Sequence, residues 1–233
     1  MLPPLEITNG SGWLDAFLNE SRSERVVQSH APKSEFNPIT LALRPHRDGS
    51  LQTLVAVTPS QFKAVESLVR RRYAWRGYSL PTSDSAATTA ACDQESMVTL
   101  LVEEHAKLVG TLTLRLDSPQ GLLAEQTYGE EIKHARSQGC RVGELIQLAM
   151  KEGVDWKSVL DALLQAIYLV ARMVHSLTDV FIEVNPRHVR FHQRVFGFAP
   201  KSAEKLCARV GAPSMLMHLD LEQFTQRLQL YTT

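Results

Sequence analysis

The chain has 233 residues, 44% of them hydrophobic and 21% charged. This composition is typical of a globular protein with a buried core and excludes a disordered or fibrous chain. Lys and Arg together number 25, as do Asp and Glu, so the formal net charge is zero. A neutral chain is not expected to hold nucleic acid or anionic lipid by general electrostatic attraction. No segment is apolar for long enough to cross a bilayer, so we expect no integral membrane association.

The three cysteines, Cys92, Cys140 and Cys207, are far apart in the sequence. Their spacing matches no zinc or redox motif, and their odd number does not indicate a disulfide framework, so we expect free thiols. The first ten residues lack the basic and apolar regions of a signal peptide. We therefore expect a cytoplasmic protein.

The hydrophobic pattern divides the chain into a partly flexible N-terminal extension at residues 1–38, with one short helix at 13–19, and a single domain at residues 39–233. The elements predicted for this domain are, in chain order, strands at 39–44 and 51–57, a helix opened by Thr58-Pro59-Ser60, a loop at 81–96, strands at 97–103 and 108–117, a helix at 119–139, a strand at 142–150, a helix at 158–175, a strand at 179–184, a helix from Asn185-Pro186 through Phe196, a strand at 214–219 and a helix at 221–230.

Two of these elements have a clear pattern. In the strand at 108–117 the leucines 112, 114 and 116 share one face, whereas Thr111, Thr113, Arg115 and Asp117 share the other. The sequence leaves open whether this polar face covers a cavity or meets water. The helix at 158–175 has a continuous apolar stripe. This order of elements predicts an α/β (α+β) fold, with a mixed sheet and helices on both faces.

Several motifs resemble one family in the same order along the chain, over about residues 52 to 222. They are RYAWRGY at 72–78, GTLTLRLD at 110–117, GELIQLA at 143–149, FIEVNPRHVRF at 181–191 and Ala212-Pro213. These residues resemble the long-chain N-acyl amino acid synthases (FeeM-type), which are related to the acyl-homoserine lactone synthases. The resemblance implies the GNAT acyltransferase fold, with a mixed, mostly antiparallel central sheet.

The resemblance also implies a reaction. A long-chain fatty acyl group would pass from the phosphopantetheine thioester of acyl carrier protein (ACP) to the α-amine of an amino acid, with no permanently bound cofactor. ACP would then be the protein partner, acyl-CoA is the alternative donor, and the oligomeric state stays open, a homodimer included. No Cys or Ser has a triad-like setting, so direct attack by the amine is favoured over an acyl-enzyme.

The predicted turn at 151–157 helps to distinguish between ACP and CoA as the acyl donor. CoA-dependent acetyltransferases hold a pyrophosphate in a glycine-containing loop, whereas this turn has one glycine and no Arg/Gln-x-x-Gly-x-Gly pattern. Lys157 and Ser158, at the start of a helix, suit the single phosphate of a carrier arm. Alternatively, Asp155 or Ser158 only caps the helix. The resemblance places Gln147 and Ala149 beside the same arm.

Glu144 is the first candidate to orient or deprotonate the amine, directly or through water. The related lactone synthases also have a functional Glu on this strand. They follow it with a basic residue three positions later, where this chain has Gln147. Ile146 and Leu148 share the face of Glu144 by the period of two, which predicts partial burial. The alternative is a solvated or salt-bridged surface Glu.

His192 is the second catalytic candidate. Many GNAT enzymes have a Tyr about seven residues after the Asn at position 185, and this Tyr protonates the leaving thiolate. His192 occupies the place in this chain, and an imidazolium can donate the same proton. Alternatively, His192 packs beside the carrier arm. His188 stands four residues earlier on the same helical face, but no third ligand has a recognisable spacing, so we expect no metal site.

Candidate substrate-binding residues follow from charge and position. Arg72 and Arg115 can pair with the carboxylate of the amino acid, and Asp117 can bind its ammonium group. Internal salt bridges are the equally weighted alternative for Arg115 and Asp117. The remaining candidates are Glu183, Asn185 and His188 near the expected entry of the pantetheine, and Tyr73 and Trp75 as walls of an acyl tunnel or of the core.

Two other functions stay open at this point. The first is a CoA-dependent acetyltransferase that acts on a small amine. The second is a catalytically weakened module that binds an acyl chain or a carrier protein, which the departures at Gln147 and His192 favour.

Overall fold

The computed structural model describes residues 50–75, 96–207 and 209–223. Residues 50–221 belong to one compact unit. The predicted extension at 1–38, the strand at 39–44, the loop up to residue 95 and most of the closing helix lie outside the described residues. In the described ranges, no helix combines the length and the hydropathy that a membrane span needs.

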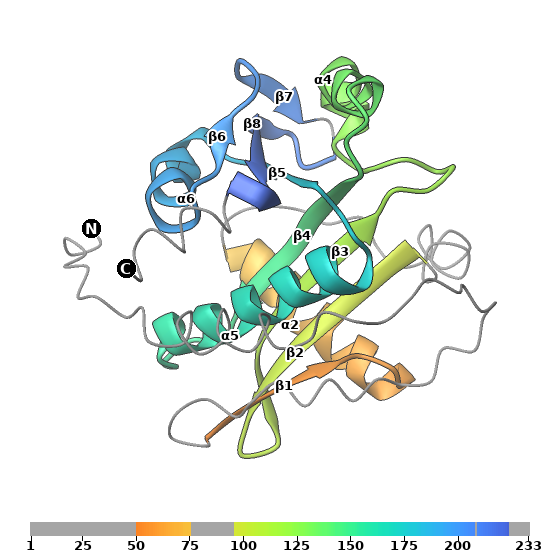
Figure 1. Cartoon of the computed structure of the whole chain (residues 1–233). Helices are drawn as coiled ribbons and strands as arrows, with labels where there is room; N and C mark the ends of the chain where they lie inside the picture. The colour runs from red at the N-terminus through yellow and green to blue at the C-terminus, as the bar shows by residue number, and fades with distance from the viewer. Residues whose placement is uncertain (1–49, 76–95, 208, 224–233) are drawn as a thin grey trace, which may run out of the picture. The chain divides into compact units, whose positions relative to one another are not determined.

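A central sheet with helices on both faces organises this unit, as the sequence predicts (Figure 1). The strands follow the order β1-β2-β3-β4-β5-β8-β6, and β7 pairs with β8. The pair β4–β5 is parallel and the other described pairs are antiparallel. The strands are β1 (Leu51–Val55), β2 (Met97–Glu104), β3 (Lys107–Leu116), β4 (Val142–Met150), β5 (Asp179–Val184), β6 (Ala199–Pro200), β7 (Lys205–Cys207) and β8 (Ala212–Asp220).

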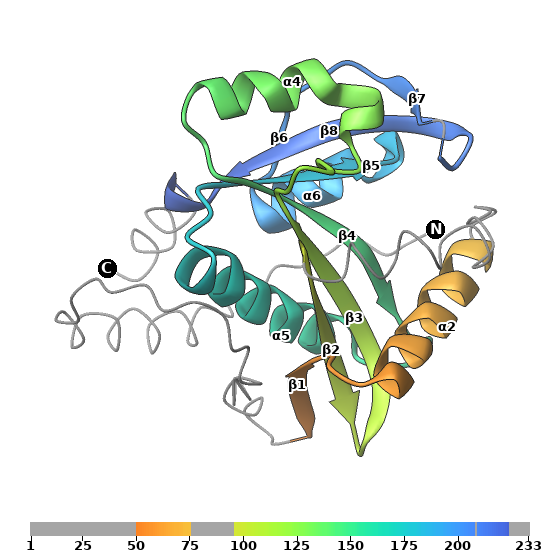
Figure 2. The same ribbon diagram turned by 90° about the vertical axis from the view of Figure 1, so that its right-hand side faces the viewer.

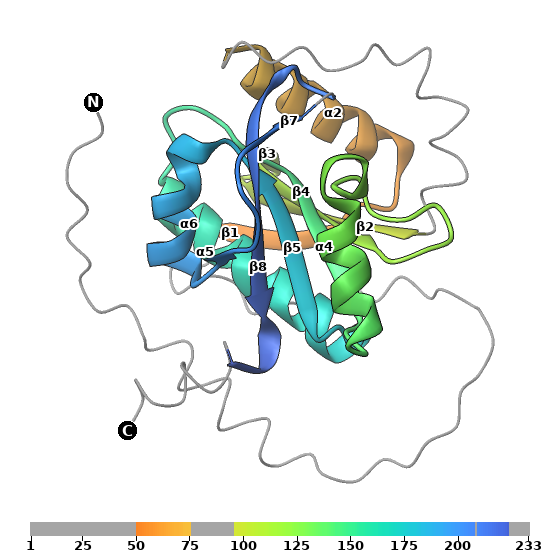
Figure 3. The same ribbon diagram turned by 90° about the horizontal axis from the view of Figure 1, so that it is seen from above.

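The helices form a layer on each side of the sheet. Figures 2 and 3 show α2 and α4 over one face and α5 and α6 over the other. We call the first the α2/α4 face and the second the α5/α6 face. The helices are α2 (Pro59–Trp75), α4 (Glu125–Ser137), α5 (Trp156–Tyr168), the π-helix η2 (Leu169–Val174), the 3₁₀-helix η3 (Pro186–His188) and α6 (Val189–Phe196).

Local sequence signals explain where α2 and α5 begin. At the start of α2, Gln61 Oε1 accepts a hydrogen bond from Thr58 N at 2.9 Å, and Gln61 N donates to Thr58 Oγ1 at 3.3 Å. This reciprocal pair is a capping box. Asp155 caps α5, since its carboxylate accepts from Lys157 N at 3.1 Å. The apolar stripe of α5 then packs on the sheet.

Two helix predictions differ from the structure. The predicted helix at 119–139 begins only at Glu125, because Gly121 takes a positive φ of 69° and residues 118–124 form turns. The predicted helix at 158–175 begins at Trp156 and becomes a π-helix at Leu169. The strands β6 and β7 were not predicted, because they are only two and three residues long and show no alternation.

Hydrophobic residues pack on both faces, but differently. The α5/α6 face carries one large cluster that includes the predicted leucines 112, 114 and 116 of β3. The α2/α4 face carries two smaller clusters, one beneath α2 around Val69 and Leu101, and one beneath α4 around Tyr128 and Phe181. Most buried polar residues of the sheet lie on the α2/α4 face, among them Thr99, Thr111, Thr113, Arg115 and Glu144.

The two central strands separate partway along their length. β4 and β5 pair only at Val142–Asp179, Gly143–Val180 and Glu144–Phe181, although β4 continues to Met150. On its other side β4 has an irregular register with β3, where Gln147 takes a positive φ of 57°. This geometry is a β-bulge, which bends the strand. Glu144 therefore lies at the last paired position before β4 and β5 diverge.

Candidate active site

Glu144 is at the centre of the buried polar residues on the α2/α4 face. Only 1% of the residue is exposed. Its Oε2 accepts hydrogen bonds from Leu123 N at 2.6 Å and from Ala124 N at 3.2 Å. Burial raises the pKa of Glu144 to about 7, although Arg209 and these two amides act in the opposite direction. The carboxyl group can therefore change its protonation state near neutral pH, as a general base must.

The burial of Glu144 is more complete than the sequence predicts, and one of its neighbours was wrongly placed. Ile146 precedes the bulge, whereas Leu148 follows it and packs in the cluster of the α5/α6 face. Ala149 packs beneath α2 instead, on the face of Glu144. The extra residue at Gln147 shifts the alternation by one position, so a strict period of two fails beyond it.

A network missed by the sequence analysis extends from Glu144 toward α4. Arg209, in the turn between β7 and β8, forms an ion pair with Glu183 and interacts electrostatically with Glu144. Ser214 Oγ donates to Glu183 Oε1 at 2.7 Å. The hydroxyl of Tyr128 donates to Ser214 O at 2.7 Å. An arginine in a short hairpin turn is ordinarily solvated, so the sequence offered no signal for Arg209.

Arg115 and Asp117, for which substrate binding and internal salt bridges were the two alternatives, have different environments. Arg115 is 4% exposed and lies opposite Glu144 in the β3–β4 pairing, and its Nε donates to Gly121 O at 2.9 Å. Asp117 is instead held by Arg136 of α4, with Nη2–Oδ1 at 2.7 Å, and Glu125 also pairs with Arg136. Asp117 thus follows the salt-bridge alternative, whereas Arg115 lies inside the buried polar group.

The candidates on α2 lie at the end of that helix. Arg72 pairs with Glu152 and lies over the ring of Trp75, 4.9 Å from its centroid. Tyr73 is partly buried against the cluster beneath α2. Trp75 is 69% exposed, so it is not part of the core in this structure. Nothing in the described residues brings Arg72 together with Glu144.

His192 lies on the opposite side of the sheet, in a cluster of aromatic rings. Its ring centroid is 5.4 Å from that of Phe191 and 5.3 Å from that of Phe196, and its Nδ1 is buried with no hydrogen-bond partner in the described part of the chain. Burial lowers the pKa of His192 to about 4, with a smaller contribution from His188. The ring is neutral at neutral pH. This environment supports the packing alternative and does not support an imidazolium donor.

Substituting Phe for His192 should change how stability depends on pH. The pKa in the fold is lower than the ordinary value, so the unfolded chain binds the proton more tightly, and the wild type loses stability as the pH falls from 6.5 toward 4. We expect H192F to gain about 2 kcal/mol over the wild type at pH 5, measured by urea unfolding, and much less at pH 8. A constant difference across this range would contradict a neutral, buried His192.

Asn185 and the remaining carrier-arm candidates have structural contacts of their own. Asn185 Nδ2 donates to Pro213 O at 3.2 Å, and its Oδ1 accepts from Arg187 N, so the side chain caps η3. Ser158 Oγ donates to the capping Asp155 at 2.7 Å, which is the capping alternative for this helix start. Lys157 is exposed, with Nζ 6.0 Å from the ring of Trp156. Thr113 Oγ1 donates to Gln147 Oε1 at 3.2 Å.

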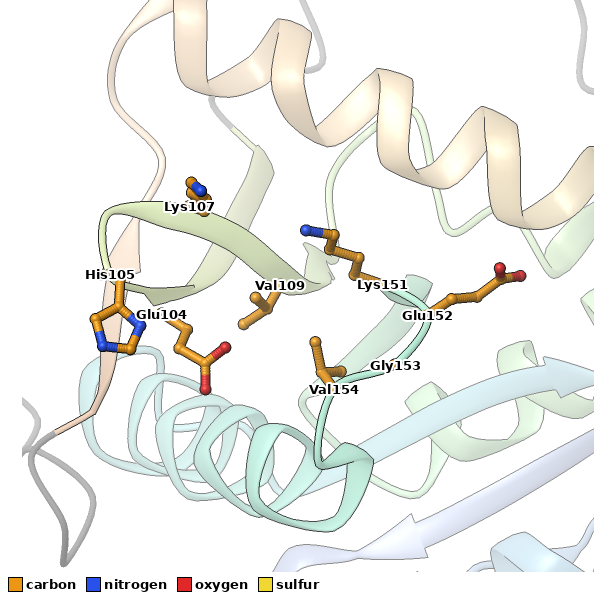
Figure 4. A pocket seen from close by; sticks show the side chains of 8 residues that line it. All are labelled: Glu104, His105, Lys107, Val109, Lys151, Glu152, Gly153 and Val154. Carbon is orange, nitrogen blue, oxygen red and sulfur yellow. The ribbon is translucent and has the colours of Figure 1, made fainter.

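The turn after β4 lines a shallow pocket with the β2–β3 turn (Figure 4). Lys107 and Lys151 contribute positive charges, but Glu104 and Glu152 contribute as many negative ones. A balanced set of charges does not focus a positive potential on a pyrophosphate. The remaining lining residues are His105, Val109, Gly153 and Val154.

Comparison with known families identifies the family to which the chain belongs. The family model of the N-acyl amino acid synthase FeeM matches residues 64–220, which include both central strands and Glu144. The chain belongs to this family. Among curated proteins no match was found. Among solved structures, FeeM from uncultured soil microbes is similar, with a TM-score of 0.67 and 25% identity over 75% of this chain and 92% of that one.

More distant structures share the fold of this FeeM-family chain. The acyl-homoserine lactone synthase LasI has a TM-score of 0.55 and 15% identity, over 76% of this chain and 93% of its own. An N-acetyltransferase from Lactobacillus plantarum, itself described as putative in its function, has a TM-score of 0.52 and 14% identity, over 74% and 99%. The predicted GNAT fold is thus confirmed, and the chain is an acyltransferase of the FeeM family.

Proposed function

We propose that this FeeM-family chain transfers a long-chain fatty acyl group from ACP to the α-amine of an amino acid in the cytoplasm. The observation that carries the proposal is Glu144, a buried carboxyl group at the point where β4 and β5 diverge, whose pKa burial raises toward neutrality. Aminolysis of a thioester needs a proton acceptor of this kind, because only the neutral amine attacks.

The proposed step is a direct attack. The α-amine adds to the thioester carbonyl carbon and gives its proton to the Glu144 carboxylate, directly or through water. The C–S bond then breaks, and the leaving thiolate takes up the proton that Glu144 accepted, directly or through water. This yields the N-acyl amino acid and the free carrier thiol and returns Glu144 to its carboxylate form. Cys207, near Glu183, does not favour an acyl-enzyme route, because burial raises the pKa of its thiol.

ACP is favoured over CoA as the donor by the features around the β4–α5 turn. The start of α5 already carries the carboxylate of Asp155, and the neighbouring pocket has balanced charges. A single phosphate on an extended arm needs fewer contacts in this region than the pyrophosphate and adenosine of CoA. The exposed Lys157 remains our candidate for that phosphate, with Gln147 and Ala149 beside the arm.

A donor comparison tests this part of the proposal. The same palmitoyl group is offered on ACP, on CoA and on pantetheine, and acetyl-CoA is offered in a separate reaction. Each reaction contains a mixture of the common amino acids, and products are measured by mass spectrometry. We expect kcat/KM to be at least about tenfold higher with ACP than with CoA, because the carrier protein adds contacts of its own. Equal use of palmitoyl-CoA would contradict ACP specificity. Product from acetyl-CoA alone would support an acetyltransferase instead.

A further inference from the structure

Arg209 is a charged group that the proposed reaction does not use. One terminal nitrogen pairs with Oε2 of Glu183, whereas Nε is buried and has no hydrogen-bond partner among the residues that the structure describes. The side chain is 28% exposed, so part of it is accessible from outside. A buried donor without a partner costs free energy, and such groups in native proteins call for an explanation, a missing ligand among them.

The charges around Arg209 match an amino acid. Although burial lowers the pKa of Arg209, Glu183 and Glu144 raise it overall, so the guanidinium stays charged between two acidic side chains. Glu183 is itself fixed by Ser214, which donates to its other oxygen at 2.7 Å. A free amino acid carries an ammonium group and a carboxylate on the same carbon. One cationic and two acidic groups side by side are complementary to this pair of charges.

Arg72 and Arg115, the two arginines that the sequence analysis proposed for the acceptor, and Arg136 of α4 all have partners in the structure. Arg72 pairs with Glu152, and Arg115 is buried with its Nε bound to Gly121 O. Arg136 holds both Asp117 and Glu125. Arg209 differs because its Nε has an unused donor and because it interacts electrostatically with Glu144.

We infer that Arg209 binds the α-carboxylate of the acceptor through Nε and a second N–H, and that this contact places the α-amine beside Glu144. A guanidinium suits this task because its two parallel N–H groups match the two oxygens of a carboxylate. The inference rests on the proposed function and adds the residue that makes the enzyme select amino acids over other amines.

The experiment compares two acceptors that differ only in the carboxylate. These are the common amino acid that the wild type acylates fastest and the methyl ester of that amino acid. The ratio of kcat/KM for the acid to that for the ester is measured in the wild type, R209Q, R209K and the control R194Q, an exposed residue of α6. We expect the ratio to fall by about 10- to 100-fold in R209Q and by less in R209K, and to stay unchanged in R194Q.

The outcomes separate this inference from the proposed function. Loss of the same size for acid and ester in R209Q would show that Arg209 only supports Glu183, and would overturn the inference. If thermal unfolding shows that R209Q is not folded, R209K serves as the test, since Lys keeps the positive charge but lacks the planar guanidinium. An unchanged acid-to-ester ratio in R209K would also overturn the inference. A wild type that acylates no amino acid would instead refute the proposed function, and this inference with it.

Discussion

Replacing Glu144 with Gln should lower kcat by about 10²- to 10⁴-fold, because the variant has no group that accepts the amine proton. Gln has nearly the same shape, and its Oε1 can still accept from Leu123 N and Ala124 N. The wild-type kcat should rise with pH through about 7, where the Glu144 carboxyl group ionises, and then level off. E144Q should not show this limb. Steady-state rates between pH 5.5 and 9 measure both effects.

The same substitution should stabilise the fold above neutral pH. The pKa of Glu144 is about 7 in the fold and 4.5 as its ordinary value, so the folded state resists ionisation that the unfolded chain undergoes. Stability is therefore lost as the pH rises from 4.5 to 7 and stays lower above that range. Gln does not ionise, and E144Q should unfold with a free energy up to about 3 kcal/mol higher than the wild type at pH 8, but equal at pH 4.

The exposed Glu130 of α4 provides the matched control. E130Q removes a carboxylate from the same region and should leave both kcat and the pH dependence of stability unchanged. If E144Q kept a tenth or more of the wild-type kcat, Glu144 would not be the proton acceptor. If it were less stable than the wild type at pH 8, the carboxylate would be a structural anchor instead.

Replacing Gly143 with Ala should destabilise the protein by about 1–3 kcal/mol. A Cβ at this position would lie 2.6 Å from Leu177 Cδ1 and 3.2 Å from the carbonyl oxygen of Arg115. The side chain of Leu177 can move, but the carbonyl belongs to the neighbouring strand β3. The clash also displaces the residue next to Glu144, so kcat should fall as well. Urea unfolding and steady-state rates measure the two effects.

Two further variants help to interpret the stability of G143A. Gly129 of α4 has open space where a Cβ would be, so G129A should be neutral or stabilising by up to about 1 kcal/mol. The double variant with L177A should be less destabilised than the sum of the two single changes, because the smaller side chain relieves the clash. Unchanged stability in G143A would show that β3 and β4 can separate at this position without cost.

The features that the sequence predicted well depend on local periodicity. Most described strands and helices follow from alternation or from an apolar stripe, as in α5, and the five motifs between residues 72 and 213 were sufficient to indicate the family. The bulge at Gln147 could not be predicted, since a positive φ at a non-glycine residue leaves no pattern in the sequence. It moved Leu148 to the other face and Ala149 to the face of Glu144.

The candidate site was harder to predict because its charged residues come from separate segments. Arg209 and Ser214 meet Glu183 only after the β7–β8 hairpin folds onto β5. Asp117 and Arg136 are 19 residues apart and pair across the turn before α4. His192 was chosen for its chemistry, but its protonation depends on the aromatic rings around it, which only the packed structure specifies.

The way in which Glu144 is held has a consequence for how acceptor preference can diversify. Its carboxylate is bound by main-chain N–H groups of residues 123 and 124, which every non-proline residue provides. Side chains of this turn can therefore be exchanged, naturally or in the laboratory, without removing the main-chain contacts that hold the Glu144 carboxylate. Libraries that vary Leu123 while excluding proline would test whether the side chains of this turn affect the choice of amine.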